Sequence, residues 1–312
     1  MRLLSLIPLP GPVVELFAEA FDFVPFTPGD PLERLHTALP EALLCAPGGP
    51  KIDGALLDRL PGGLRAIATY SVGYDHIDLA ACRARGLAVF NTPEVLTASV
   101  ADAALLLILG AARRATEAIE LIRSGGWSGW TPTQLVGTEL AGKRLGIMGM
   151  GRVGRRIAAR AAAFGMELAY SNRHRAAEEA GARFVADPRE LFAQSDVFLL
   201  ACPSTDETRR FVDRALLSQA PRNLILVNVG RGDLVDDEAL IAALASRRIT
   251  AAGLDVFDQE PNFDQRYLAL PNVFMLPHIG SSTIEARLGM GRVLADGMNA
   301  WRRDGALSNR IA

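Results

Sequence analysis

Short apolar runs alternate with longer stretches of helical period from one end of the chain to the other. Strands that alternate with helices are typical of βαβ units, so the first half is predicted to form a parallel sheet of the flavodoxin-like kind. The strands are expected at Leu3–Ile7, Phe23–Phe26, Ala42–Ala46, Ala66–Thr69 and Ala88–Asn91, and the helices at Pro12–Ala20, Leu32–Leu39, Gly54–Leu60 and Leu79–Arg85.

A second series of the same kind follows further along the chain. Its six apolar runs, with helical patterns between them, fit a second doubly wound parallel sheet. These strands are expected at Arg144–Met148, Glu167–Tyr170, Val197–Ala201, Leu224–Asn228, Ala251–Val256 and Val273–Leu276.

Two further helical patterns define the domain organisation. One long, mostly apolar helix is predicted from Val95 to about Arg123, followed by an irregular arm with the sequence GGWSGW and TPTQLVGTELAG, residues 125–142. The last helix, Thr283–Arg303, lies beyond the final strand and is expected to return to the first domain. The chain is therefore predicted to be an α/β protein with two domains, residues 1–95 plus 283–312 and an inserted domain of residues 96–282.

Composition supports two soluble domains and excludes several classes of partner. The 312 residues correspond to about two domains of roughly 150 residues each. Hydrophobic residues make up 49%, charged residues 22%, and the net charge is −2, which fits neither a disordered chain nor a polybasic nucleic-acid-binding surface. A small-molecule partner is expected, with no nucleic acid and no membrane, because the longest apolar run is too short to cross a bilayer.

The cysteines and the N-terminal segment indicate the compartment. Three cysteines form no CxxC pair, which favours a reducing compartment over a disulfide framework and gives no metal site: Cys45, Cys82 and Cys202. Pro8 and Pro10 interrupt the first apolar run, so a strand is expected there rather than a signal peptide. The predicted location is the cytoplasm.

A glycine-rich turn carries the first chemical signal. It directly follows the strand Arg144–Met148 and opens a helix, and its residues are Gly149, Met150, Gly151, Arg152, Val153 and Gly154. In a GxGxxG turn the first glycine allows a tight turn, the second admits a pyrophosphate, and the third lets helix and strand approach. The turn therefore predicts dinucleotide binding, and the alternative is a turn used only for packing.

The residues after the next strand bear on cofactor choice. An NAD-selective site places an acidic residue about 20 positions after the glycines, where it binds the adenosine ribose. Here Asn172 occupies that region, and Arg173 and Arg175 could pair with a 2′-phosphate. NADP is therefore predicted to be preferred, with NAD possible. The alternative is that both arginines are ordinary surface charges.

Three segments place polar groups just after predicted strands, where doubly wound sheets bind ligands. They carry Arg231, then Asp255 and Glu260, then His278. With the segments SVGYDHIDL, NTPEVLTASVADAALLLIL and GMGRVG, they resemble the D-isomer-specific 2-hydroxyacid dehydrogenase family over nearly the whole chain. The resemblance implies a flavodoxin-like substrate domain and an inserted Rossmann dinucleotide-binding domain.

The same resemblance implies an active site of Arg231, Glu260 and His278. Reduction of a 2-keto acid by hydride transfer needs a proton donor at the carbonyl oxygen, and histidine suits that role. Glu260 would stabilise the imidazolium, while Arg231 would hold the substrate carboxylate and polarise the keto oxygen.

The resemblance also implies three contacts outside this triad. Asp255 is expected to contact the nicotinamide carboxamide, and the backbone N–H groups of Val72 and Gly73 are expected to bind the substrate carboxylate. Other polar residues are expected to have structural or surface roles. His76 is predicted to be structural or a rim residue, His36 and His174 to be surface residues, and Asp236 to cap a helix.

The loop GYDHIDL, the aromatic arm GGWSGW and the missing ribose acid resemble the glyoxylate/hydroxypyruvate reductase branch. The expected reaction is the NADP-dependent reduction of glyoxylate or hydroxypyruvate. The alternatives are a dehydrogenase for a bulkier D-2-hydroxy acid and a non-catalytic NAD(P)-sensing protein of the corepressor type. Gly230 departs from the family, in which bulkier residues precede the arginine, and could alter the pocket.

A homodimer is expected from the apolar helix and the arm. The helix is apolar all round near Leu105–Leu109, so it must be buried on several sides, and one domain is not expected to cover it alone. In relatives this region embraces a second subunit. Trp127 or Trp130 would then pack in the interface or reach the partner's active-site mouth.

Overall fold

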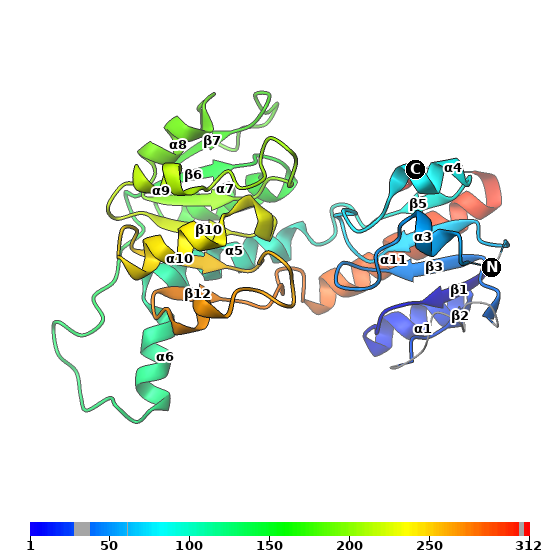
Figure 1. Cartoon of the computed structure of the whole chain (residues 1–312), viewed down its shortest axis with the longest axis horizontal. Coiled ribbons are helices and arrows are strands. Elements are labelled where there is room, and N and C mark those ends of the chain that lie inside the picture. Colours follow the sequence, from blue (N-terminus) through cyan, green and yellow to red (C-terminus); the bar gives the residue numbers. More distant parts are fainter. Residues whose placement is uncertain (28–37, 61, 306–308) are drawn as a thin grey trace. The chain divides into compact units, whose positions relative to one another are not determined.

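The computed structural model describes residues 1–27, 38–60, 62–305 and 309–312, and these fall into two compact units (Figure 1). The smaller unit comprises Met1–Leu96 and Ser282–Ala312, and the larger comprises Thr97–Ser281. Each bound lies within one residue of the predicted domain division. What each unit binds stays a prediction.

The smaller unit is built on a parallel sheet of five strands. Their order, β2-β1-β3-β4-β5, is the flavodoxin-like order expected from the sequence. The strands are β1 (Arg2–Ser5), β2 (Asp22–Val24), β3 (Ala42–Cys45), β4 (Ala66–Thr69) and β5 (Ala88–Phe90), and the helices are α1 (Gly11–Ala20), α3 (Gly54–Leu57), α4 (Leu79–Ala84) and α11 (Ile284–Asp304). The predicted helix at residues 32–39 lies largely, and His36 wholly, outside the described residues.

The C-terminal helix α11 returns to this unit, as the sequence predicts, and packs against α1. The contact is close, because a side chain at Gly291 would place its Cβ 3.0 Å from Val13 Cγ1. The helix begins at a defined cap, where the Thr283 hydroxyl accepts the Ala286 N–H. It ends at Gly305 in the left-handed conformation.

The larger unit has seven parallel strands in the order β12-β11-β10-β9-β6-β7-β8, where the sequence predicts six. The missed strand is β8, which pairs with β7 but has only two residues, so no apolar run marks it. The strands are β6 (Arg144–Met148), β7 (Glu167–Ser171), β8 (Arg183–Phe184), β9 (Val197–Leu200), β10 (Ile225–Asn228), β11 (Ala251–Leu254) and β12 (Val273–Met275).

Helices cover both faces of this sheet (Figure 1), because alternate residues of each strand point to opposite faces. On β9, Val197 and Leu199 belong to one buried core, while Phe198 and Leu200 belong to the other. The first core includes residues of α5 (Thr97–Ala112) and α7 (Arg152–Ala163), and the second includes residues of α8 (Pro188–Gln194), α9 (Arg214–Ser218) and α10 (Asp237–Ala245). Because both faces of the sheet are buried, its strands must be apolar along nearly their whole length.

The prediction of one long helix from Val95 to about Arg123 is wrong, because the structure has two helices there. Helix α5 ends at Ala112, Arg114 adopts a left-handed φ of 54°, and α6 (Ala115–Arg123) follows. The carbonyl of Ala112 accepts the Thr138 N–H from the returning arm, at 2.8 Å. A contact between distant segments therefore accompanies the break, and no local sequence signal shows it.

The structure also relocates the apolar surface on which the dimer prediction depends. Helix α5 packs against α7 and strands β10 to β12 of its own unit, so this unit covers most of α5. By contrast, α6 has no buried residue, and Ile122 at its end is 65% exposed. Helix α6 and the arm that follows it project from the sheet (Figure 1).

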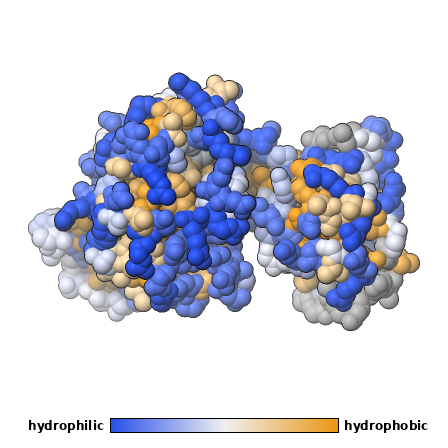
Figure 2. All heavy atoms as spheres, turned by 45° about the horizontal axis from the view of Figure 1, so that its top comes forward, coloured by the Kyte–Doolittle hydropathy of each residue, from blue (hydrophilic) through white to orange (hydrophobic). Residues whose placement is uncertain are grey.

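The remaining visible surface is mixed. The face of the larger unit drawn in Figure 2 is mostly hydrophilic, with small apolar patches between the polar side chains. Among the described residues, no helix combines the length and the apolar character needed to cross a bilayer.

Candidate active site

The glycine turn has the close approaches that its sequence predicts. Gly149 has a φ of 110°, and a Cβ there would lie 2.6 Å from the backbone nitrogen of Cys202. A Cβ on Gly154 would lie 2.1 Å from the Gly149 carbonyl oxygen. Gly151, in contrast, faces open space, with no atom within 4 Å of a Cβ. Gly149 and Gly154 therefore permit close backbone contact, and Gly151 leaves room beside the start of the helix.

That room lies where a dinucleotide pyrophosphate would fit. Gly151 is the N-cap of α7, and no side chain caps this helix end. The N-terminus of an uncapped helix offers backbone N–H donors and a positive dipole end to an anion. The turn also follows β6 next to β9, where the strand order reverses, which is the usual ligand position in such sheets.

The three residues predicted to select the cofactor have different bonding partners in the structure. The Asn172 Oδ1 atom accepts the Met150 N–H at 2.7 Å, so this side chain holds the glycine turn. Arg175 binds Glu179 through two hydrogen bonds of 2.7 and 3.1 Å, and Glu179 also accepts the Tyr170 hydroxyl. Arg173 is exposed and has no ion-pair partner among the described residues. The sequence predicts the same phosphate-binding role for both arginines, but in the structure only Arg175 is already paired with a carboxylate.

The three predicted catalytic side chains follow three neighbouring strands. Arg231 comes after β10, Glu260 after β11 and His278 after β12. His278 Nδ1 and Glu260 Oε2 are 2.6 Å apart. The other carboxylate oxygen of Glu260 accepts the Phe257 N–H at 2.7 Å, so the backbone orients the carboxylate toward the imidazole.

The pair shifts the pKa of both partners in the direction that favours the charged forms. The hydrogen bond to Glu260 raises the pKa of His278, and burial opposes this. Burial raises the pKa of Glu260, but the hydrogen bonds from His278 and the Phe257 N–H outweigh it and lower that pKa. With 42% of its side chain exposed, His278 remains accessible to a substrate.

Asp255 holds the turn that carries His278. Its two carboxylate oxygens accept the N–H groups of Ile279 and Gly280, at 2.8 and 2.9 Å. Its carbonyl accepts the His278 N–H at 2.8 Å, and His278 has a left-handed φ of 53°. Sequence reasoning missed this role, because the partners lie more than twenty positions away. The expected contact between Asp255 and a nicotinamide stays a prediction.

Arg231 has a similar backbone support that the sequence did not reveal. The Asn228 side chain donates to the Arg231 carbonyl at 2.8 Å and accepts the Gly230 N–H at 3.0 Å. A Cβ at Gly230 would lie 2.8 Å from the Cys202 carbonyl and 2.9 Å from Leu234 Cδ1. Glycine at this position therefore permits close packing of the loop.

The predicted substrate-carboxylate residues lie in the smaller unit, in the loop after β4. The Val72 carbonyl accepts the Asn91 side-chain N–H at 2.9 Å, and the Ser71 carbonyl accepts the Thr92 N–H at 3.0 Å. Val72 and Gly73 are partly buried. The loop is thus held by two neighbouring residues at the end of β5.

The remaining polar residues have structural or surface positions. Asp236 caps α10 by accepting the Ala239 N–H, as predicted, and His174 is exposed. Burial raises the pKa of the Cys202 thiol to about 11. Within the described ranges, no three His, Cys, Asp or Glu side chains are grouped so that they could hold a metal ion.

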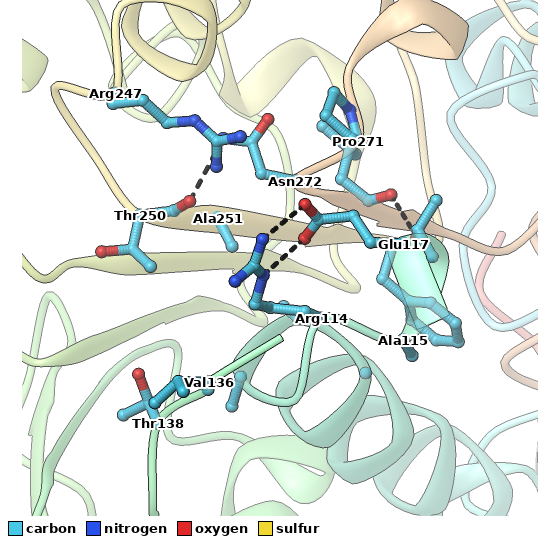
Figure 3. A pocket seen from close by; sticks show the side chains of 17 residues that line it. Arg114, Ala115, Glu117, Val136, Thr138, Arg247, Thr250, Ala251, Pro271 and Asn272 are labelled. Carbon is cyan, nitrogen blue, oxygen red and sulfur yellow. Dashed lines mark hydrogen bonds and ion pairs between the residues drawn. The ribbon is translucent and has the colours of Figure 1, made fainter. Parts of the chain in front are cut away.

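A cavity of about 250 Å³ lies elsewhere in the larger unit (Figure 3). Its lining includes Arg114, Glu117 and Thr250, and Arg114 and Glu117 form an ion pair with each other. Thr250 precedes β11, so this cavity lies at the opposite ends of the strands from His278 and Glu260. It is therefore separate from the candidate active site.

Comparisons with known proteins give the family context of this geometry. A family model described as D-isomer specific 2-hydroxyacid dehydrogenase, NAD binding domain, matches residues 105–280. A glycerate dehydrogenase of Hyphomicrobium methylovorum is 40% identical over 94% of this chain and 93% of its own length. A glyoxylate reductase of Thermococcus litoralis is 44% identical over 81% of this chain and 78% of its own.

A solved structure has the same fold over the whole of this chain. The NADPH-dependent glyoxylate/hydroxypyruvate reductase of Sinorhizobium meliloti, in complex with NADP and malonate, superposes with a TM-score of 0.87. It is 33% identical, and the match covers 100% of this chain and 96% of that one. The family resemblance drawn from the sequence is confirmed.

Proposed function

The chain belongs to the D-isomer specific 2-hydroxyacid dehydrogenases, a family of oxidoreductases, and we propose that it reduces small 2-keto acids such as glyoxylate and hydroxypyruvate. The relatives named glyoxylate reductase and glyoxylate/hydroxypyruvate reductase B support this substrate class. The observation that carries the proposal is the 2.6 Å contact between His278 and Glu260 after adjacent strands of a dinucleotide-type sheet.

We propose that one atom of His278 transfers the proton. Nδ1 of His278 is bonded to Glu260, so the Nε2–H is the proton that a substrate can receive. A nicotinamide dinucleotide, when bound, would supply the hydride for the keto carbon. His278 donates its Nε2 proton to the keto oxygen and becomes neutral, which completes the 2-hydroxy acid. In the reverse direction, neutral His278 accepts the hydroxyl proton.

Arg231 and the loop of Val72 and Gly73 complete the proposal by binding the substrate anion. The planar guanidinium of Arg231 offers several N–H donors, so it can hold the carboxylate and stabilise charge on the keto oxygen. The N–H groups of Val72 and Gly73 would bind the same carboxylate. Asp255 would contact the nicotinamide while its carboxylate holds the turn of His278.

NADP is proposed as the preferred cofactor. Asn172 carries no charge that would repel a 2′-phosphate, and Arg173 is available to pair with one. Arg175 is already paired with Glu179, so Arg173 is proposed as the main phosphate ligand. The NADPH-dependent relative from Sinorhizobium meliloti supports the same choice, and NAD remains a possible second cofactor.

A homodimer is also proposed, with helix α6 and the arm as the interface. Several large apolar side chains are exposed there, and a second copy of the chain would cover them. They are Ile119 at 45%, Ile122 at 65%, Trp127 at 56%, Trp130 at 80% and Val136 at 66% exposure. Light scattering at micromolar concentration should give twice the chain mass of 33.4 kDa, and a monomeric mass would contradict the interface.

The reaction is tested by a panel of acids and both cofactors. Purified protein is mixed with NADPH or NADH and with glyoxylate, hydroxypyruvate, pyruvate or a bulkier 2-keto acid, and oxidation is followed by absorbance. The proposal expects the highest kcat/KM for NADPH with glyoxylate or hydroxypyruvate. A preference for the bulkier acids would favour the alternative substrate class, and no turnover with any acid would favour a nucleotide-sensing protein.

A further inference from the structure

A chain of side-chain hydrogen bonds lies beneath the loop of Val72 and Gly73. The Ser71 hydroxyl is 2.6 Å from the Gly73 carbonyl oxygen, and Thr69 Oγ1 is 2.6 Å from Ser71 Oγ. His76 Nε2 is 3.0 Å from Thr69 Oγ1. Thr69 is fully buried, and Ser71 and His76 are partly buried.

The direction of every bond in this chain follows from counting protons. A carbonyl oxygen only accepts, so Ser71 must donate its one hydroxyl proton to Gly73. Ser71 can then only accept from Thr69, which uses the one proton of Thr69. The remaining contact, between Thr69 and His76, needs a third proton, and only His76 Nε2 can supply it.

The neighbouring cysteine agrees with this assignment. Cys45 Sγ lies 3.7 Å from the same His76 nitrogen and 3.5 Å from the Ala68 carbonyl oxygen. The thiol proton is directed to that carbonyl, so the sulfur presents a weak acceptor to His76. Cys45 Sγ and Thr69 Oγ1 therefore both accept from His76 Nε2, and a deprotonated Nε2 would face a lone pair of each.

We infer that His76 is a positioning residue for substrate binding, acting as the first donor of a one-way relay that runs through Thr69 and Ser71 to the Gly73 carbonyl. This inference rests on the proposed function, in which the N–H groups of Val72 and Gly73 bind the substrate carboxylate. Hydrogen bonds in a chain polarise and orient one another, so the relay holds the Gly73 carbonyl and the peptide that follows it. The two preceding peptides, which present the N–H groups of Val72 and Gly73, are held through their own carbonyls, so the relay completes the support of the loop from its far side.

The relay needs only the proton on Nε2. The neutral Nε2–H tautomer and the imidazolium both carry that proton, so titration of Nδ1 leaves the relay intact. His76 therefore differs from His278, whose gain and loss of a proton is the proposed chemical event. A change at His76 should alter substrate binding without moving the pH dependence that His278 sets.

The first test is the tautomer of His76 in the wild-type protein. Long-range proton–nitrogen NMR spectra of protein labelled with nitrogen-15 in its four histidines distinguish the two tautomers, and loss of one signal in His76→Gln assigns His76. A proton on Nε2 is expected at neutral pH. A proton on Nδ1 alone would overturn the relay. This measurement does not depend on any enzymatic activity.

The second test separates the donor from the bulk of the side chain. In His76→Leu the relay loses its first donor, and the KM for glyoxylate should rise roughly tenfold, as expected for one lost hydrogen bond. The kcat should change by less than about twofold, and the affinity for NADPH should be unchanged, because neither depends on the substrate carboxylate. His76→Gln keeps a side-chain N–H donor and should restore most of the lost substrate affinity.

Thr69 provides a matched pair of controls. Thr69→Val has nearly the same shape without the hydroxyl and should raise the KM as His76→Leu does, whereas Thr69→Ser should not. An unchanged KM in His76→Leu and Thr69→Val, or equal defects in His76→Leu and His76→Gln, would overturn the inference. If the wild-type protein turned over no 2-keto acid, the proposed function would fail, while the tautomer measurement would still decide whether the relay exists.

Discussion

Two carboxylate–cation contacts in the larger unit have nearly the same length and very different surroundings. His278 and Glu260 are 2.6 Å apart, and Arg175 and Glu179 are 2.7 Å apart. The first pair joins residues after two different strands, and backbone groups hold both partners. The second joins residues four positions apart on the surface, with Tyr170 as the further support of Glu179.

The difference shows that distance alone does not identify a functional pair. Around His278 and Glu260, a backbone N–H fixes the Glu260 carboxylate and a backbone hydrogen bond holds the main chain of His278. The carboxylate can therefore set the pKa of a group that is proposed to lose a proton. Arg175 has no proton to lose in its working range, and Glu179 only neutralises it. The first pair is proposed to control chemistry, and the second to control how much charge a cofactor meets.

The largest expected effect comes from removing the imidazole of the first pair. His278→Ala should lower kcat for keto-acid reduction by roughly 10²- to 10⁴-fold, because the proton donor is lost. Binding of NADPH, measured by fluorescence titration, should stay within about twofold of wild type, since no proposed cofactor contact is removed. His174→Ala makes the same change at an exposed histidine and should have no effect on kcat. Near-normal turnover in His278→Ala would exclude His278 as the acid.

The second effect tests the charge of Glu260. Reduction needs protonated His278, so its rate falls as pH rises through the pKa of that histidine. Because Glu260 raises this pKa, Glu260→Gln should lower it and move the alkaline limb of the reduction profile to lower pH. The deficit should be largest above neutrality. Glu179→Gln removes a carboxylate of the other pair, and a matching shift in that variant would show that the effect is not local.

The sequence predicts most of the fold because buried parallel strands are apolar along their whole length. It predicts five strands in one unit and misses only β8 in the other, where two residues give no periodic signal. The break between α5 and α6 was missed for a different reason. Thr138 contacts the end of α5 from the returning arm, and local propensity does not report such contacts.

The candidate site also has features that the sequence predicts and contacts that only the folded chain reveals. Position after a strand, with the family resemblance, predicts Arg231, Glu260 and His278 as the site, and the structure shows Glu260 and His278 in contact. The sequence could not show that Asp255 holds the turn of His278, because that contact joins residues 24 and 25 positions apart. Nor could it show that Arg175 is already paired, since an arginine has several possible partners and only the folded chain selects one.

The third effect concerns the cofactor edge near the second pair. Asn172→Asp keeps an oxygen that can accept the Met150 N–H, so the glycine turn should be retained while a negative charge is added. Repulsion of the 2′-phosphate should lower the ratio of kcat/KM for NADPH over NADH roughly tenfold, which corresponds to about 1.4 kcal/mol. Asn172→Ala loses the hydrogen bond without adding charge and should weaken both cofactors alike. An unchanged ratio in Asn172→Asp would remove this residue from cofactor selection.

The smallest effect tests whether Glu179 competes with a phosphate for Arg175. Glu179→Gln keeps the size of the side chain and an oxygen for the Tyr170 hydroxyl, but it no longer neutralises Arg175. The KM for NADPH should fall by roughly two- to fivefold, the range expected for an exposed ion pair, and the KM for NADH should not change. Glu178→Gln is the matched control, because Glu178 pairs with Arg155 instead.

The double variant decides between competition and a general change of surface charge. If Glu179 acts only by occupying Arg175, then Glu179→Gln should give no gain in a protein that already carries Arg175→Ala, and the two changes will not be additive. A gain that persists without Arg175, or one that Glu178→Gln reproduces, would mean that any lost negative charge near the site attracts NADPH. The pair would then be ordinary surface electrostatics, and the contrast with His278 and Glu260 would be complete.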